Sequence, residues 1–245
     1  MLPALLLAAL TAVADNPQTA TTTDGRSVIL NPNGTWSFAD GSPPPLAVDH
    51  EAAAQALKTE ISEAINSGDI AQAKRKTALM LESYASTSAA RRMTQTAQEL
   101  GLIDKDAPDR IEVEKWLANE APIDLQRMAP TVLVFWETWC PHCVREVPKL
   151  QTLMDTYEIR GLEVVGITRI TKTSTEEAVE QFIQEHKIKF PIGKDIDVDG
   201  KGKLSSFFAV KGIPAVAVVM EGKVIWRGHP GRINDSLVLS WLGGE

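Results

Sequence analysis

The sequence is poor in several features that define common protein classes. It has two cysteines in 245 residues, so a scaffold built on several disulfides is excluded. Its 25 Lys and Arg residues are outnumbered by 32 Asp and Glu residues, and the formal net charge of −7 argues against a nucleic-acid-binding surface. No apolar run approaches the about 20 residues that a membrane-spanning helix requires. The composition, with 44% hydrophobic residues, is that of a globular chain in one large or two smaller domains.

The extreme N-terminus has the pattern of an export signal. Residues 2–14 form an apolar and small-residue run that ends in Ala12-Val13-Ala14, a small-x-small pattern typical of signal peptidase sites. The run departs from the usual signal in one respect, since no Lys or Arg precedes Leu2. The sequence therefore predicts a signal peptide over residues 1–14, a mature chain beginning at Asp15, and a protein that is periplasmic or otherwise exported.

The next segment, residues 15–40, predicts a small three-stranded β-meander. β-Favouring residues alternate there with two turn signals, and Gly25 and Gly34 supply the positive φ that tight hairpin turns need. A sheet this small is not stable alone, so we expect it to be a packing accessory. Residues 41–47 follow with three consecutive prolines and predict a stiff extended linker.

Residues 48–107 predict an α-helical segment. Leu57, Ile61 and Ile65 fall at helical spacing, and Ser67-Gly68-Asp69 ends that helix and caps the next. Helical stretches continue over residues 70–84 and 88–100. Two interpretations stay open, a helical spacer that packs on its neighbours or a module for dimerisation or partner docking.

From residue 108 to residue 245 strands and helices alternate. Four apolar, β-rich runs predict strands at residues 131–136, 163–168, 215–220 and 223–228, and the first run is continuous, as in a strand buried on both faces. Helical stretches are expected at residues 144–157, 175–186, 204–208 and 235–242. This order predicts an α/β domain with a mixed sheet and helices on both faces.

The two cysteines stand where the strand at 131–136 ends and a helix begins. A cysteine at a helix N-terminus faces unpaired backbone N–H groups and the positive end of the helix dipole, so its thiolate is favoured and nucleophilic. Cys140 holds that position. Cys143 lies within reach to form a disulfide with it, and Pro141 is tolerated because the first helical residue needs no N–H.

Other uses of this cysteine pair fit the sequence less well. A structural zinc site needs four ligands, and His50, His186 and His229 show no ligand spacing. Haem attachment needs a histidine directly after the second cysteine, where Val144 stands. A purely structural disulfide across two residues would close too short a loop to stabilise the fold much. Redox activity is therefore the favoured interpretation.

With these residues the chain resembles the thioredoxin fold and, within it, the TlpA/ResA-like exported thiol-disulfide oxidoreductases, over about residues 123–242. Residues 139–143, Trp-Cys-Pro-His-Cys, match the active-site motif, and Pro148 matches the proline that bends the active-site helix. Gly212-Ile213-Pro214 match the loop whose proline is cis, and residues 175–192 fit the insertion of this group. The resemblance implies a mixed central sheet flanked by helices, preceded in this chain by the β-meander and the helical segment.

The resemblance also implies roles for three catalytic residues. Cys140 is expected to be the exposed nucleophile, and Cys143 the buried cysteine that resolves the mixed disulfide. Val134 occupies the place of the buried aspartate of thioredoxin, so Glu146 is expected to accept the proton of Cys143, with a pKa raised by partial burial.

Substrate contacts are assigned to residues on both sides of the cysteine pair. Trp139 and His142 belong to the active-site motif itself. A cis bond before Pro214 would expose the backbone of Ile213 beside Cys140, where an extended peptide can add as a strand.

The predicted function is an exported thiol-disulfide oxidoreductase that exchanges disulfides with protein substrates. It needs no organic cofactor and no metal, because the Cys140–Cys143 pair is itself the redox-active disulfide, which an unidentified redox partner resets. His142 resembles the histidine of the oxidising DsbA proteins, so the direction of electron flow stays open, as does the oligomeric state. The alternative is a copper-binding thioredoxin-fold protein, with Cys140, Cys143 and His142 as Cu(I) ligands.

Overall fold

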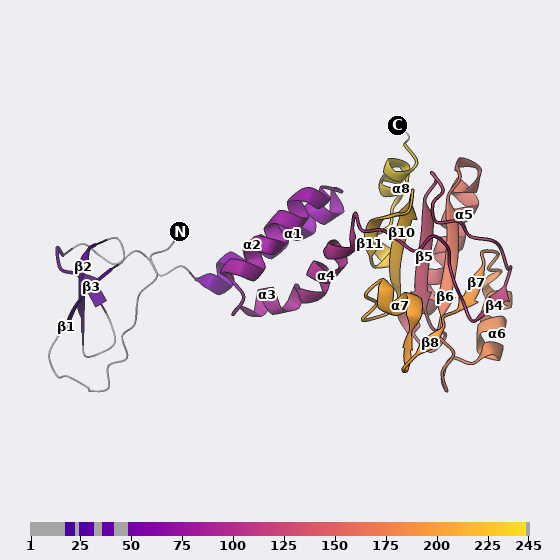
Figure 1. Cartoon of the computed structure of the whole chain (residues 1–245), viewed down its shortest axis with the longest axis horizontal. Helices are drawn as coiled ribbons and strands as arrows, with labels where there is room; N and C mark the ends of the chain where they lie inside the picture. The colour runs from indigo at the N-terminus through magenta and orange to yellow at the C-terminus, as the bar shows by residue number, and fades with distance from the viewer. Residues whose placement is uncertain (1–17, 23–24, 32–35, 42–48, 244–245) are drawn as a thin grey trace. The chain divides into compact units, whose positions relative to one another are not determined.

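The computed structural model describes residues 18–22, 25–31, 36–41 and 49–243. The chain divides into two compact units, residues 1–53 and 54–245 (Figure 1). The predicted signal peptide, residues 1–14, and residues 42–47 of the predicted linker lie outside the described residues. None of the helices in the described ranges combines the length and the apolar character needed to cross a membrane.

The first unit contains a three-stranded antiparallel sheet, in the order β1-β2-β3. Its strands are β1 (Gln18–Thr21), β2 (Ser27–Leu30) and β3 (Trp36–Phe38). Val28 and Phe38 are register partners on neighbouring strands and are both buried, so one face of the sheet carries its small core. Gly25, in the first turn, has a φ of +85°, which an L side chain rarely adopts.

Four helices make up the helical segment. They are α1 (His50–Asn66), α2 (Ile70–Ser83), α3 (Ser88–Arg92) and α4 (Thr94–Leu102). The stretch expected as one helix over 88–100 is broken at Met93, whose amide bonds back to the Ala90 carbonyl (3.0 Å) in a tighter turn. The Met93 side chain is buried in the core of the helical segment with Ile61, Met80 and Leu100.

The second unit is built around a six-stranded mixed sheet, in the order β11-β10-β5-β6-β7-β4. The three central strands, β5, β6 and β7, run parallel, and the outer strands pair antiparallel. The strands are β4 (Lys115–Ala118), β5 (Thr131–Trp136), β6 (Glu163–Thr168), β7 (Ile192–Lys194), β10 (Ala215–Met220) and β11 (Lys223–Gly228). A separate two-stranded pair, β8 (Asp197–Val198) with β9 (Lys201–Gly202), lies between β7 and β10 in sequence.

Both faces of this sheet are covered, which confirms the predicted architecture (Figure 1). On β5, Val132, Val134 and Trp136 belong to one core cluster, and Leu133 and Phe135 belong to the other. Every residue of β5 is buried for this reason, as its continuous apolar run predicts. The first core receives side chains from α5 (Pro141–Tyr157), α6 (Glu176–His186) and α8 (Asp235–Trp241), and the second from α7 (Lys203–Phe207).

The helical segment packs on the sheet at its outer strand β11. The amide of Asp104 donates to the carbonyl of Val224 (2.8 Å), and Glu99 of α4 lies 3.7 Å from the buried guanidinium of Arg227. α4 is thereby fixed to β11, and β11 is the neighbour of β10 in the sheet. The loop that precedes β10 contributes to the site described below.

Candidate active site

The first turn of α5 places the two cysteines. β5 ends at Trp136, the chain turns through residues 137–140, and Pro141 starts the helix with Cys140 as its N-cap. The amide of Cys143 donates to the Cys140 sulfur (3.4 Å), because the first amides of a helix have no partner within the helix. A negative charge on the Cys140 sulfur is thus stabilised by a backbone donor and by the helix dipole.

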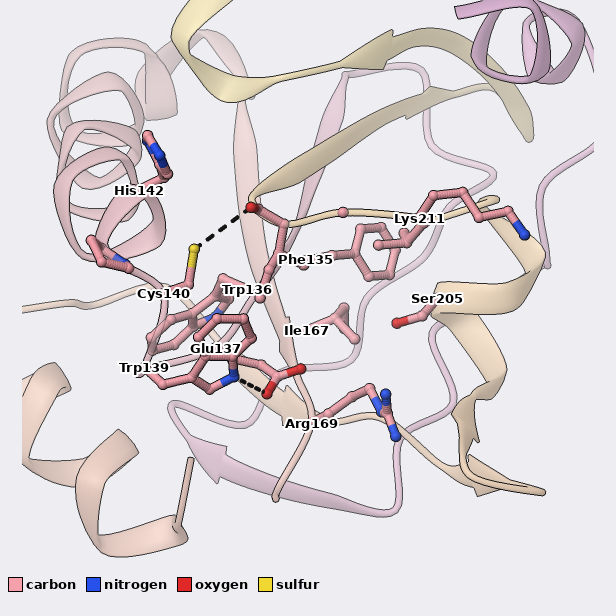
Figure 2. Close-up of a pocket in the computed structure, with 14 residues that line it drawn as sticks. Phe135, Trp136, Glu137, Trp139, Cys140, His142, Ile167, Arg169, Ser205 and Lys211 are labelled. Carbon is pink, nitrogen blue, oxygen red and sulfur yellow. Dashed lines mark hydrogen bonds between the residues drawn. The ribbon is translucent and has the colours of Figure 1, made fainter. Parts of the chain in front are cut away.

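Both cysteines are buried free thiols, which corrects the expectation of an exposed Cys140. Cys143 has no exposed surface, and Cys140 keeps 4%. The reason is the loop that precedes β10, since the Cys140 thiol donates to the carbonyl oxygen of Ile213 (3.6 Å) and is covered on that side (Figure 2). The remaining surface of Cys140 faces a pocket of about 500 Å³.

The surroundings of Cys143 keep its thiol protonated. Burial raises the pKa of Cys143 far above its ordinary value, the hydrogen bond with Cys140 raises it further, and the charges of Cys140 and Glu137 add smaller contributions. A backbone hydrogen bond from Glu137 acts in the opposite direction but does not reverse the shift. The two thiols therefore differ in their surroundings, although the difference in exposure is small, and the assignment of Cys140 as the nucleophile stays a prediction.

The loop before β10 brings Ile213 and Pro214 against the cysteines. The Ile213–Pro214 peptide bond is cis, and Pro214 is buried. Arg227 on β11 donates to the carbonyls of Phe208 (2.9 Å) and Val216 (3.1 Å), so one buried guanidinium holds both ends of this loop.

Glu146 is buried, with 5% of its surface exposed, but its environment is not the one predicted. Its two carboxylate oxygens accept from Arg145 Nε (2.9 Å) and Lys149 Nζ (2.9 Å). The Lys149 hydrogen bond dominates, so the pKa of Glu146 is lowered even though burial opposes this. The expectation of a raised pKa was wrong, because two flanking cations supply more stabilisation than burial removes. Within the described residues, no hydrogen bond joins Glu146 to Cys143.

His142 and Trp139 both line the pocket, as their assignment to substrate contacts requires. His142 is exposed, and its Nδ1 lies 2.9 Å from Arg145 Nη2. Trp139 is 53% exposed and donates from Nε1 to the Glu137 carboxylate (2.6 Å), as Figure 2 shows.

Glu137 is the site residue that the sequence analysis missed. It is only 9% exposed and lines the pocket beside Cys140. One signal in the sequence could have indicated Glu137. It is a carboxylate that directly follows a strand whose last five residues are apolar and that precedes an indole donor by two residues. Its other partner, Thr171, is far away in the chain and could not have been inferred from spacing.

Comparison with known families matches residues 103–227, just over half of the chain, to the AhpC/TSA family. The chain belongs to the AhpC/TSA family. The matched range contains all the site residues named above and most of the six-stranded sheet, so the AhpC/TSA part of this chain is the domain that carries the cysteines.

Two curated relatives of this AhpC/TSA domain confirm the resemblance to the TlpA/ResA-like proteins. "Sporulation thiol-disulfide oxidoreductase A" of Bacillus subtilis is 28% identical over 45% of this chain and 65% of its own length. "Thiol-disulfide oxidoreductase ResA" of Oceanobacillus iheyensis is 29% identical over 42% of this chain and 55% of its own length. The chain thus spans about half to two thirds of these relatives. The crystal structure of StoA from Bacillus subtilis is 23% identical, over 56% of this chain and 98% of that one, with a TM-score of 0.44.

Proposed function

We propose that this protein is an exported thiol-disulfide oxidoreductase that exchanges disulfides with protein substrates through Cys140 and Cys143. The observation that carries the proposal is the arrangement at the start of α5. One sulfur accepts a helix-terminal amide and faces a pocket, and the other is fully buried with a raised pKa. The names of the curated relatives support the same reaction class.

The reaction follows from this asymmetry. The Cys140 thiolate attacks one sulfur of a substrate disulfide, so a Cys140–substrate bond forms and the substrate S–S bond breaks, with its second sulfur leaving as a thiol. Cys143 then loses its proton to solvent and attacks the Cys140 sulfur, and the substrate sulfur bound to Cys140 leaves and takes up a proton from solvent. The Cys140–Cys143 disulfide forms and the substrate leaves with both sulfurs reduced, having gained two electrons. The reverse sequence oxidises a substrate dithiol.

Substrate backbone has a place to bind beside Cys140. The carbonyl of Ile213 lies 3.6 Å from the Cys140 sulfur and belongs to a loop that leads into β10. Such a backbone segment can accept an extended peptide by strand addition, which presents the substrate sulfur to Cys140. Protein thiols and disulfides are accordingly the proposed substrates, and a separate redox partner is proposed to reset the pair.

Two further parts of the proposal come from the sequence alone. Export to the periplasm depends on the signal peptide predicted at residues 1–14, and no organic cofactor is required.

The copper-binding alternative, with Cys140, Cys143 and His142 as Cu(I) ligands, stays a prediction. Protein that is purified anaerobically with bound copper and that shows no disulfide exchange would favour it.

The test of the proposed function is trapping of substrate. Cys143→Ala cannot resolve the mixed disulfide and should accumulate it, whereas Cys140→Ala should form none. The products are separated by non-reducing electrophoresis and identified by mass spectrometry. Equal trapping by both variants would contradict the assignment of Cys140 as nucleophile.

A further inference from the structure

Trp139 is held in one orientation although more than half of its surface is open. The residue directly precedes Cys140 and is 53% exposed. A side chain this exposed normally exchanges between rotamers on a fast timescale. In this site its Nε1 donates to the Glu137 carboxylate at 2.6 Å, a short charge-assisted bond that orients the ring at the pocket that Cys140 also lines (Figure 2).

The carboxylate that holds the ring is itself firmly placed. Thr171 Oγ1 donates to the same Glu137 oxygen at 3.4 Å. The neighbouring residue Thr138 is joined to Ser174 by two bonds, from its amide (3.2 Å) and between the two hydroxyls (3.0 Å). The segment that carries Glu137 and Trp139 is therefore tied to the loop between β6 and α6.

This arrangement has an electrostatic cost. A buried carboxylate loses hydration, and the charge of Glu137 is the smallest of the causes that raise the pKa of Cys143. Within the described part of the chain, no ion pair involves Glu137. Arg169 lines the same pocket, but its guanidinium lies 3.6 Å from the carboxylate of Asp197. The Glu137 carboxylate is therefore stabilised by the Thr171 hydroxyl and the Trp139 indole. Its hydrogen bond to Trp139 is the feature that requires an explanation.

We propose that Glu137 is a positioning residue that fixes the Trp139 ring as one wall of the substrate pocket. The pocket is also lined by apolar side chains, namely Phe135, Ile167, Val210 and Ile213, and by the polar or charged side chains of His142, Arg169, Ser205 and Lys211. A fixed ring in a pocket that also holds these apolar side chains favours a substrate whose cysteine is flanked by an aromatic residue, because aromatic rings gain from ordered packing. The inference rests on the proposed function and names its preferred substrate class.

The first part of the test observes the ring itself and needs no activity. The indole N–H resonance of Trp139, assigned with Trp139→Phe, should lie downfield and exchange slowly with solvent in the unmodified chain. Glu137→Ala should move it to the position and exchange rate of a solvent-exposed indole, and Glu137→Gln, which keeps an acceptor oxygen, should give an intermediate result. An indole resonance that Glu137→Ala leaves unchanged would overturn the proposal.

The second part measures selectivity in the Cys143→Ala background, where the attack of Cys140 is observed without resolution. Two peptide disulfides that differ only in the residue next to cysteine, Phe or Gly, are compared by their rates of trapping. Adding Glu137→Ala should lower the Phe-to-Gly rate ratio about fivefold, whereas Glu137→Gln should retain most of it. Glu185→Ala, an exposed change on α6, is the matched control and should keep the ratio.

The outcomes separate the two proposals. Trapping of both peptides with a ratio that Glu137→Ala leaves unchanged would overturn the positioning role alone. Failure to trap either peptide would contradict the proposed function, and with it the preference for aromatic-flanked substrates.

Discussion

Glu137 and Glu146 stand three residues outside the cysteine pair, one before Cys140 and one after Cys143, and both are buried. Their partners differ. Glu146 accepts from two cations, whereas Glu137 accepts from an indole and a hydroxyl. Of the two, only Glu137 is among the groups that shift the pKa of Cys143, and it acts in both directions, because its backbone hydrogen bond lowers that pKa and its charge raises it. At equal spacing from the cysteine pair, the two carboxylates therefore have different surroundings, which their positions in the sequence do not predict.

The largest effect is expected from removing both cations beside Glu146. Arg145→Met with Lys149→Met leaves a buried carboxylate without a partner, so burial should then raise the pKa of Glu146, as the sequence had predicted. We expect a loss of about 2 kcal/mol in unfolding free energy, limited because both cations are solvent-exposed. Denaturant unfolding measures the loss, and NMR titration of the Glu146 carboxyl measures the pKa. A pKa of Glu146 that stays low in this double variant would show that other groups stabilise its carboxylate.

A smaller effect is expected from Glu146→Gln. The folded-state pKa of Glu146 is lowered, so its stabilisation is fully present above the ordinary carboxyl value of about 4.3 and is lost as pH falls through the folded value. The variant should be about 1 kcal/mol less stable at neutral pH, and the difference should vanish in acid. Unfolding curves over this pH range provide the check, with Glu185→Gln as an exposed control. A stability difference that grows in acid would contradict the lowered pKa.

The smallest effect concerns Glu137. Glu137→Gln removes the charge but keeps an oxygen for the Trp139 indole, so the pKa of Cys143 should fall modestly. Attack of Cys143 on the mixed disulfide should become about threefold faster at neutral pH. Rapid-quench measurement of resolution gives the rate. An unchanged or slower rate would mean that the charge of Glu137 does not act on Cys143.

Much of the fold could be predicted because its signals are local. The continuous apolar run of β5 predicted a strand buried on both faces, and Pro141 with Cys140 predicted the start of α5. Strand β4 was missed because four residues at a sheet edge carry too little pattern, and the break at Met93 has no glycine or proline to mark it.

The site was predictable in its composition but not in its contacts. Cys140, Cys143, Ile213 and Pro214 were found from motifs and do lie together. The burial of Cys140 and the bond from Thr171 to Glu137 depend on segments 73 and 34 residues away in the chain. Such contacts are set by the packing of the sheet and cannot be inferred from spacing.

In the proposed function one buried thiol, that of Cys140, is the nucleophile and the other, that of Cys143, is kept protonated. Alkylation by iodoacetamide, followed from mildly acidic to alkaline pH, tests it in the single-cysteine variants Cys143→Ala and Cys140→Ala under native conditions. The Cys140 thiol should react about 100-fold faster at neutral pH, because burial, the largest cause of the raised pKa of Cys143, persists in the Cys140→Ala variant. Equal rates, or faster reaction of Cys143, would contradict the account.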